Sequence, residues 1–165
     1  MATLAFLHAG AVMAAEQVSY ENKKTGLKFS YPANWVADEK VPGIAVAFGA
    51  PKDKANLDLV ENVTVIIQDL TPERSTLERY TKAYEKELKS EPSAKVVEST
   101  KTTLAGLPAH MIVCVGKQGT FDIRFMQVWT VKDGKAYLLT YGAPKSTYEN
   151  FLAEAESIIS SLRFI

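Results

Sequence analysis

The residues best suited to acid–base or nucleophilic chemistry are a histidine and a cysteine on one short stretch, His110 and Cys114. They fall within Ala109 to Val115, an apolar run that predicts a buried strand with both side chains on one face. A thiol and an imidazole can act together as nucleophile and base. Neighbours on one strand seldom take that orientation, and an apolar environment keeps a thiol protonated. The pattern therefore favours a core or edge histidine and an inert cysteine.

Carboxylates gather in the polar stretch from Ala50 to Asn62, APKDKANLDLVEN, which contains Asp53, Asp58 and Glu61. Oxygen ligands of this kind are those that Ca²⁺ prefers. The spacing does not follow an EF-hand loop, which needs a glycine at its sixth position and acidic residues at alternate ones. We predict a solvated loop here. Binding of Ca²⁺ or another divalent cation by Asp53, Asp58 and Glu61 is the alternative.

The sequence contains no nucleophile elbow, phosphate-binding loop or dinucleotide-binding fingerprint. We therefore predict no catalytic residue and no cofactor, and an enzyme that uses His110 is the least favoured hypothesis. Charge bears on another class of function: 19 basic residues balance 19 acidic ones, which gives no support to nucleic-acid binding.

The element that organises the chain is a hairpin followed by a helix. Two apolar runs flank Asp133 and Gly134, a dipeptide that tolerates the positive φ angles of a type I′ turn. Both faces of the run from Phe121 to Val131 are partly apolar, which predicts a central strand. The residues from Ser146 to Glu149 match a capping box, so a helix is predicted to start there and to carry an apolar face as far as Leu162.

The rest of the chain alternates in the same way. A second capping box, Ser75 to Glu78, predicts a helix with an apolar stripe. The stretch from Val96 to Thr103 is less apolar and is predicted to lie at an edge. Short turns between strands imply mainly antiparallel pairing. The predicted fold class is α+β, a mainly antiparallel β-sheet flanked by helices in an α/β/α sandwich. Further strands are predicted at Val18–Tyr20, Leu27–Tyr31, Ile44–Phe48, Asn62–Asp69 and Ala109–Val115.

The first 14 residues, MATLAFLHAGAVMA, form an apolar stretch that ends in small residues, as a secretory signal peptide does. Cleavage after Ala14 would give a mature chain that starts near Ala15, although no Lys or Arg precedes the apolar run. The stretch is too short to span a bilayer, so an integral membrane protein is not predicted. We expect export, and we expect residues 15–165 to form a single domain.

Several strings of residues make the chain similar to the PsbP family, whose name-giving member is an extrinsic subunit of the oxygen-evolving complex of photosystem II. The similarity extends from Tyr20 to Phe164. Its most specific parts are the Pro-x-x-Trp corner at Pro32 and Trp35 and the hairpin at Asp133 and Gly134, which are structural and not catalytic. The matching strings are Gly26–Pro32, Asn62–Gln68 and Thr130–Tyr137 with the terminal helix.

This resemblance implies an antiparallel sheet sandwiched by helices, export, and a non-enzymatic role in binding a larger assembly or ions. The first hypothesis is a domain in the periplasm, the thylakoid lumen or the extracellular space that docks on a protein or a membrane-associated complex. The alternatives are a photosystem II extrinsic subunit and a divalent-cation or small-ligand binding module. Positions associated with metal binding in plant members fall at Arg124 and Lys145, whose positive charges do not favour a cation.

Overall fold

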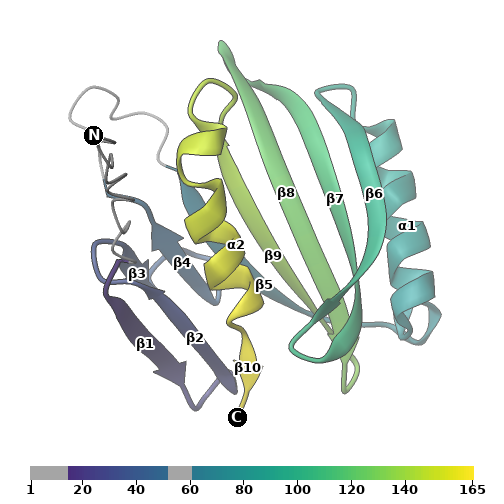
Figure 1. Cartoon of the computed structure of the whole chain (residues 1–165). Helices are drawn as coiled ribbons and strands as arrows, with labels where there is room; N and C mark the ends of the chain where they lie inside the picture. The colour runs from purple at the N-terminus through teal and green to yellow at the C-terminus, as the bar shows by residue number, and fades with distance from the viewer. Residues whose placement is uncertain (1–14, 52–60) are drawn as a thin grey trace, which may run out of the picture.

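The computed structural model describes residues 15–51 and 61–165, whose strands form two antiparallel sheets (Figure 1). The larger sheet has the order β3–β4–β5–β9–β8–β7–β6, and the smaller has the order β1–β2–β10. The strands are β1 (Gln17–Asn22), β2 (Leu27–Pro32), β3 (Val36–Asp38), β4 (Val46–Gly49), β5 (Asn62–Asp69), β6 (Ala94–Leu104), β7 (Leu107–Gln118), β8 (Phe121–Lys132), β9 (Lys135–Pro144) and β10 (Arg163–Phe164).

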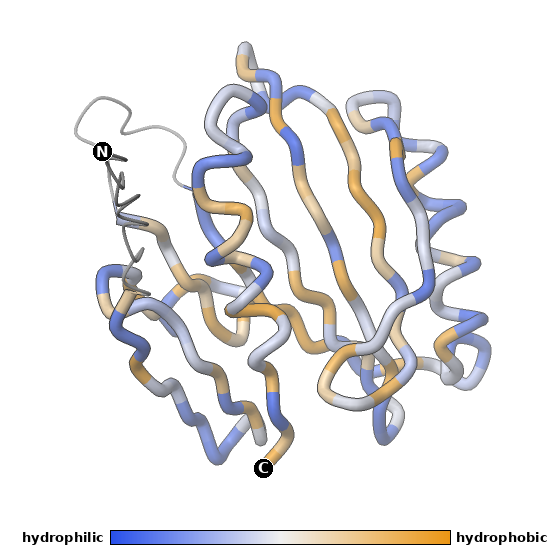
Figure 2. Tube along the Cα trace, in the orientation of Figure 1, coloured by the Kyte–Doolittle hydropathy of each residue, from blue (hydrophilic) through white to orange (hydrophobic). Residues whose placement is uncertain are grey.

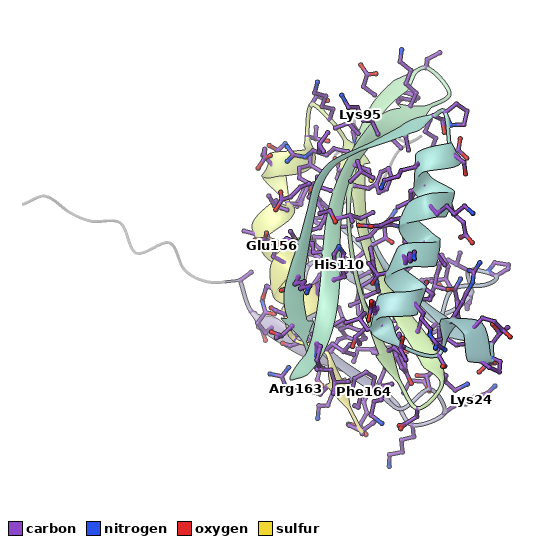
Figure 3. The ribbon with its side chains drawn as sticks, turned by 90° about the vertical axis from the view of Figure 1, so that its right-hand side faces the viewer. Lys24, Lys95, His110, Glu156, Arg163 and Phe164 are labelled. Atoms are coloured by element: carbon purple, nitrogen blue, oxygen red, sulfur yellow. The ribbon has the colours of Figure 1, made fainter. Side chains whose placement is uncertain are left out.

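The larger sheet is covered on both faces. Helix α1 (Leu77–Ser90) packs on one face, and helix α2 (Leu152–Ser160) packs on the other together with the smaller sheet (Figures 1 and 3). The predicted α+β fold with mainly antiparallel pairing is therefore confirmed. The hairpin of β1 and β2 does not extend the main sheet, because β2 pairs with β10 through Lys28 and Arg163.

The predicted central hairpin is confirmed. β8 and β9 occupy the middle of the larger sheet, and Asp133 and Gly134 have φ angles of 50° and 72°. Side chains of β8 alternate between the two cores: Trp129 packs in the core under α1, and Val128 packs in the core under α2. β6 forms the end of the sheet, as its weaker apolar pattern predicted.

Both predicted capping boxes are wrong. The Thr76 hydroxyl caps α1 by accepting a hydrogen bond from the Arg79 amide at 3.3 Å. Ser75 instead donates to the Pro72 carbonyl, because residues 72–74 form a 3₁₀ turn ahead of the helix. A second 3₁₀ turn, Tyr148–Asn150, precedes α2, so this helix starts at residue 152 and not near Ser146.

Hydropathy follows this layering. In Figure 2 the hydrophobic residues concentrate along the central strands, and hydrophilic residues dominate much of α1. Among the residues described, no helix is long and apolar enough to cross a bilayer.

Candidate functional site

His110 belongs to a polar cluster between α1 and the sheet (Figure 3). Its Nε2 atom lies 2.8 Å from the Ser99 hydroxyl and 3.5 Å from the nearer carboxylate oxygen of Glu85. The hydroxyl donates to the same Glu85 oxygen at 2.7 Å. Because that hydroxyl has a single proton, the cluster is satisfied when Nε2 carries a proton and donates to Ser99. The ring of Trp129 lies beside the imidazole, with 5.2 Å between centroids.

This cluster has the composition of a catalytic triad without its geometry. In a triad the imidazole accepts the serine proton through one nitrogen and contacts the carboxylate through the other. Here the Ser99 hydroxyl lies between the imidazole and the carboxylate and uses its own proton to bind Glu85. The contacts fasten α1 to β6 and β7, and they leave Ser99 without an imidazole base.

Cys114 shares the α1 side of β7 with His110, as predicted, but Ile112 lies between them in the same core. The cysteine is fully buried, and burial raises the pKa of its thiol to about 11. The thiol therefore stays protonated at neutral pH, which makes it a poor nucleophile.

The predicted cation ligands do not form a described site. Asp53 and Asp58 lie outside the described residues. Glu61 is described, and its carboxylate accepts a hydrogen bond from the Thr147 hydroxyl at 2.6 Å. Across residues 15–51 and 61–165, no group of three or more His, Cys, Asp and Glu side chains is placed to hold a metal ion. Cation binding by the three carboxylates stays a prediction.

Arg124 and Lys145, the two positions associated with metal binding in plant members, make structural contacts. The guanidinium of Arg124 lies over the Tyr148 ring, 4.7 Å from its centroid, and pairs with Glu149 at 3.3 Å. Burial raises the pKa of Tyr148 to about 12, and the nearby guanidinium lowers it in part. Lys145 is exposed, and its backbone amide donates to the Asp122 carbonyl.

The residues of the Pro-x-x-Trp corner join elements of the fold. The Trp35 amide donates to the Pro32 carbonyl at 2.9 Å, and the buried indole packs edge-on against Phe151 of the segment that leads into α2. Asp133 and Gly134 form the turn of the central hairpin. These four residues position strands and make no contact that suggests chemistry.

Helix α1 covers only part of its face of the larger sheet. Its apolar side chains pack over strands β6, β7 and β8 and over the first half of β9, at Ala136 and Leu138. Beyond α1, the last residues of β4, the first residues of β5 and the last residues of β9 face the same side of the sheet. They are glycine, alanine, threonine and asparagine residues, all partly exposed. The cross-strand register aligns them in two rows. We call these six residues the open sheet face: Gly49, Asn62 and Gly142 in one row, and Ala47, Thr64 and Thr140 in the next.

A groove of about 620 Å³ lies over the β3 side of this surface. Its floor includes Gly49 and Thr64, and its walls are largely apolar. Val36 is 67% exposed on one wall, and Val41 is 36% exposed. A smaller hollow of about 150 Å³ continues from Asn62 across β9 toward β8.

Polar groups border the groove and do not fill it. Among its described lining residues, Asp38 is the charged one, and its carboxylate accepts the backbone N–H of Lys40 at 2.8 Å. On the α1 side, the Tyr84 hydroxyl donates to Gln127, whose amide donates to Thr140 at 3.2 Å. Such a surface can bind an apolar group.

The sequence did not identify this surface. Its residues are small, and their openness depends on where α1 packs, which local periodicity does not encode. The available signal was Gly142 inside a strongly apolar strand, since an interior strand glycine often marks a place where another group approaches the backbone closely.

A family model described as PsbP-like protein matches residues 13–164. No curated protein matches the sequence significantly.

Solved structures match nearly the whole chain. Cyanobacterial PsbP from Synechocystis sp. PCC 6803 has a TM-score of 0.61 at 19% identity, over 94% of this chain and 96% of that one. LpqN of Mycobacterium tuberculosis, described as involved in cell envelope biogenesis, has a TM-score of 0.63 at 13% identity, over 90% of each chain. The Ran-binding protein Mog1p of Saccharomyces cerevisiae has a TM-score of 0.59 at 9% identity, over 92% and 96%. At these identities the likeness concerns the fold.

Proposed function

The chain belongs to the PsbP-like protein family, and we propose that it is an exported, non-enzymatic domain that binds a protein partner through the open sheet face. The observation that carries this proposal is the groove over β3, β4 and β5, with its apolar walls and the strongly exposed Val36. A concave surface of several hundred Å³ with a mostly apolar lining and a few polar groups is the usual form of a binding site.

The contacts of the reactive side chains support the non-enzymatic part of the proposal. The Ser99 proton is engaged by a carboxylate, and the Cys114 thiol is buried with a raised pKa. A catalytic group needs access to a substrate and a matched pKa. Both residues lie under or beside α1, away from the groove.

The apolar segment at residues 1–14 supports export. The fold is also that of LpqN, which is described in connection with the cell envelope, and of Mog1p, which is described as Ran-binding. By analogy, we propose that this chain is located in the cell envelope or a lumen and that it binds a protein partner. A photosystem II subunit is the particular case in which the partner is that complex.

The first test expresses the chain in its native host with a C-terminal tag. Cell fractionation and mass spectrometry determine its compartment and its mature N-terminus, which we expect near Ala15. Recovery in the cytosol with an uncleaved N-terminus would overturn export.

The second test compares partner capture by the wild type, Gly142→Trp and Val97→Trp. A Cβ atom added at Gly142 meets no other atom within 4 Å, so a side chain can be attached there without a backbone collision, and an indole would project over the open sheet face. Val97 is 52% exposed on β6, at the other end of the sheet. We expect capture to fall at least about tenfold for Gly142→Trp and to persist for Val97→Trp. Equal capture by all three proteins would overturn this docking site.

A further inference from the structure

We infer that the partner covers the open sheet face with an amphipathic α-helix, which would lie beside α1 on the same face of the sheet. This inference rests on the proposed function, because it specifies what occupies the surface proposed there. Four features of the surface point to a helix: its backbone pairing, its width, its small side chains and its charge.

The backbone of the open sheet face is already paired. β4 lies between β3 and β5, β5 lies between β4 and β9, and β9 lies between β5 and β8. The groove therefore offers no row of backbone groups to an extended peptide, which would lie in it with its own N–H and C=O groups unpaired. Burying those groups is unfavourable. A helix satisfies its backbone internally and needs only side-chain contacts.

The width of the surface suits one helix. Neighbouring strands lie about 4.8 Å apart, so three strands span about 14 Å, and a helix with its side chains is about 10–12 Å across. The chain itself shows this mode of packing: α1 covers the neighbouring part of the face with Tyr80, Tyr84 and Leu88. A second helix beside it would complete the layer.

Small residues in the floor favour large apolar side chains on the partner. Gly49 and Gly142 have no side chain, and the Cβ of Ala47 is the whole of its side chain, so a bulky partner residue can reach the sheet backbone. Val36 would contact the outer flank of the helix. Asp38 lies on the same flank, where a basic residue of the partner would complement its charge.

Strand addition at an edge is the competing mode. β3 is the edge next to the groove, but it has three residues and would form few ladder hydrogen bonds. An added strand would find a longer edge at β6, which has eleven residues and lies at the opposite end of the sheet. The apolar groove beside the shorter edge is thus better explained by packing than by pairing.

Site-specific photocrosslinking in the native host tests this inference. A benzoylphenylalanine is placed at Val36 or Thr64 in the full chain, with Val97 as the matched exposed control, and the partner residues that crosslink are mapped by mass spectrometry. We expect crosslinks from the two groove positions to one partner segment, at residues three or four apart. Spacings of two residues would indicate a strand and overturn the helix.

The outcomes separate this inference from the proposed function. Crosslinks to a small molecule at the groove would overturn the helix. Absence of any adduct at Val36 and Thr64, or crosslinking at Val97 alone, would overturn the proposed docking site and the helix with it. Charge gives an independent readout: Asp38→Lys should reduce capture about threefold, whereas Glu98→Lys on β6 should leave it unchanged. Increased capture by Asp38→Lys would contradict a basic flank on the helix.

Discussion

A methyl group at Gly116 would collide with the segment that joins α1 to β6. A Cβ atom built there lies 2.4 Å from the Ser93 carbonyl oxygen and 3.3 Å from the Cα of Ala94. Both contacts are with backbone, which cannot rotate away as a side chain can. We therefore expect Gly116→Ala to displace Ser93 and its neighbours from β7.

The size of the effect follows from two contributions. Inserting a methyl group where there is no space typically destabilises a core by about 1–3 kcal/mol. The displacement also strains the hydrogen bond from the Lys117 amide to the Ser93 carbonyl, at 3.1 Å, which contributes about 1 kcal/mol. Together they predict a loss of about 2–4 kcal/mol in the free energy of unfolding. For a domain of this size, that lowers Tm by about 5–15 °C.

Urea unfolding followed by circular dichroism measures this loss, and Gly142→Ala is the matched control. A Cβ at Gly142 has no neighbour within 4 Å, and alanine suits a strand interior better than glycine, so this substitution should leave the free energy of unfolding unchanged or raise it by up to about 1 kcal/mol. If Gly116→Ala unfolds at the same urea concentration as Gly142→Ala, with the same m-value, the collision argument is refuted.

Four further predictions concern buried or bridging groups. Because burial shields Cys114 and raises its pKa to about 11, iodoacetamide at pH 8 should label the native chain far more slowly than the urea-unfolded chain. The folded thiol keeps its proton to a higher pH than the unfolded one, so stability should fall as pH rises from about 9 to 11; a flat profile there would contradict the shift. Tyr141→Phe removes a buried hydroxyl that donates to the Tyr148 carbonyl at 2.8 Å, and it should cost about 1–2 kcal/mol in urea unfolding, with an unchanged midpoint as the contrary result. Ser99→Ala breaks the link to His110 and should cost about 1 kcal/mol or less without affecting partner capture; lost capture at full stability would give this cluster a binding role.

The sequence predicted the parts of the fold that local pattern controls. Asp133 and Gly134 specified the central turn, and the two-sided apolar pattern of β8 predicted its central position. The start of α2 was missed because the segment before it contacts the neighbouring strand β9. The Tyr141 hydroxyl donates to the carbonyl of Tyr148, the first residue of the 3₁₀ turn Tyr148–Asn150, whereas a capping pattern reports only on the four residues that compose it. The pairing of β2 with β10 is likewise a contact between the two ends of the domain.

The candidate site was less accessible to sequence reasoning. Motif searches look for side chains that can do chemistry, and those side chains led to His110 and Cys114, which are fastened or buried. The open sheet face is instead marked by residues with little or no side chain, which no sequence motif describes. This surface could be identified only once the strand register was known, because the register aligns Gly49, Asn62 and Gly142 across three strands.

The contrast along these rows is itself an argument for binding. The row that contains Gly49 and Gly142 continues on β8 with Phe125, which is the cross-strand neighbour of Gly142. Phe125 is large and packs against the core under α1. A sheet face that only meets water is ordinarily built from longer polar and β-branched residues, which suit strands better than glycine and alanine do. Glycine in a strand interior weakens the strand by roughly 0.5–1 kcal/mol. Ala47, Gly49 and Gly142 thus reduce stability without improving solvation, and close approach of another molecule accounts for them. The other three residues of the open sheet face, Asn62, Thr64 and Thr140, are of kinds that a solvated face also carries.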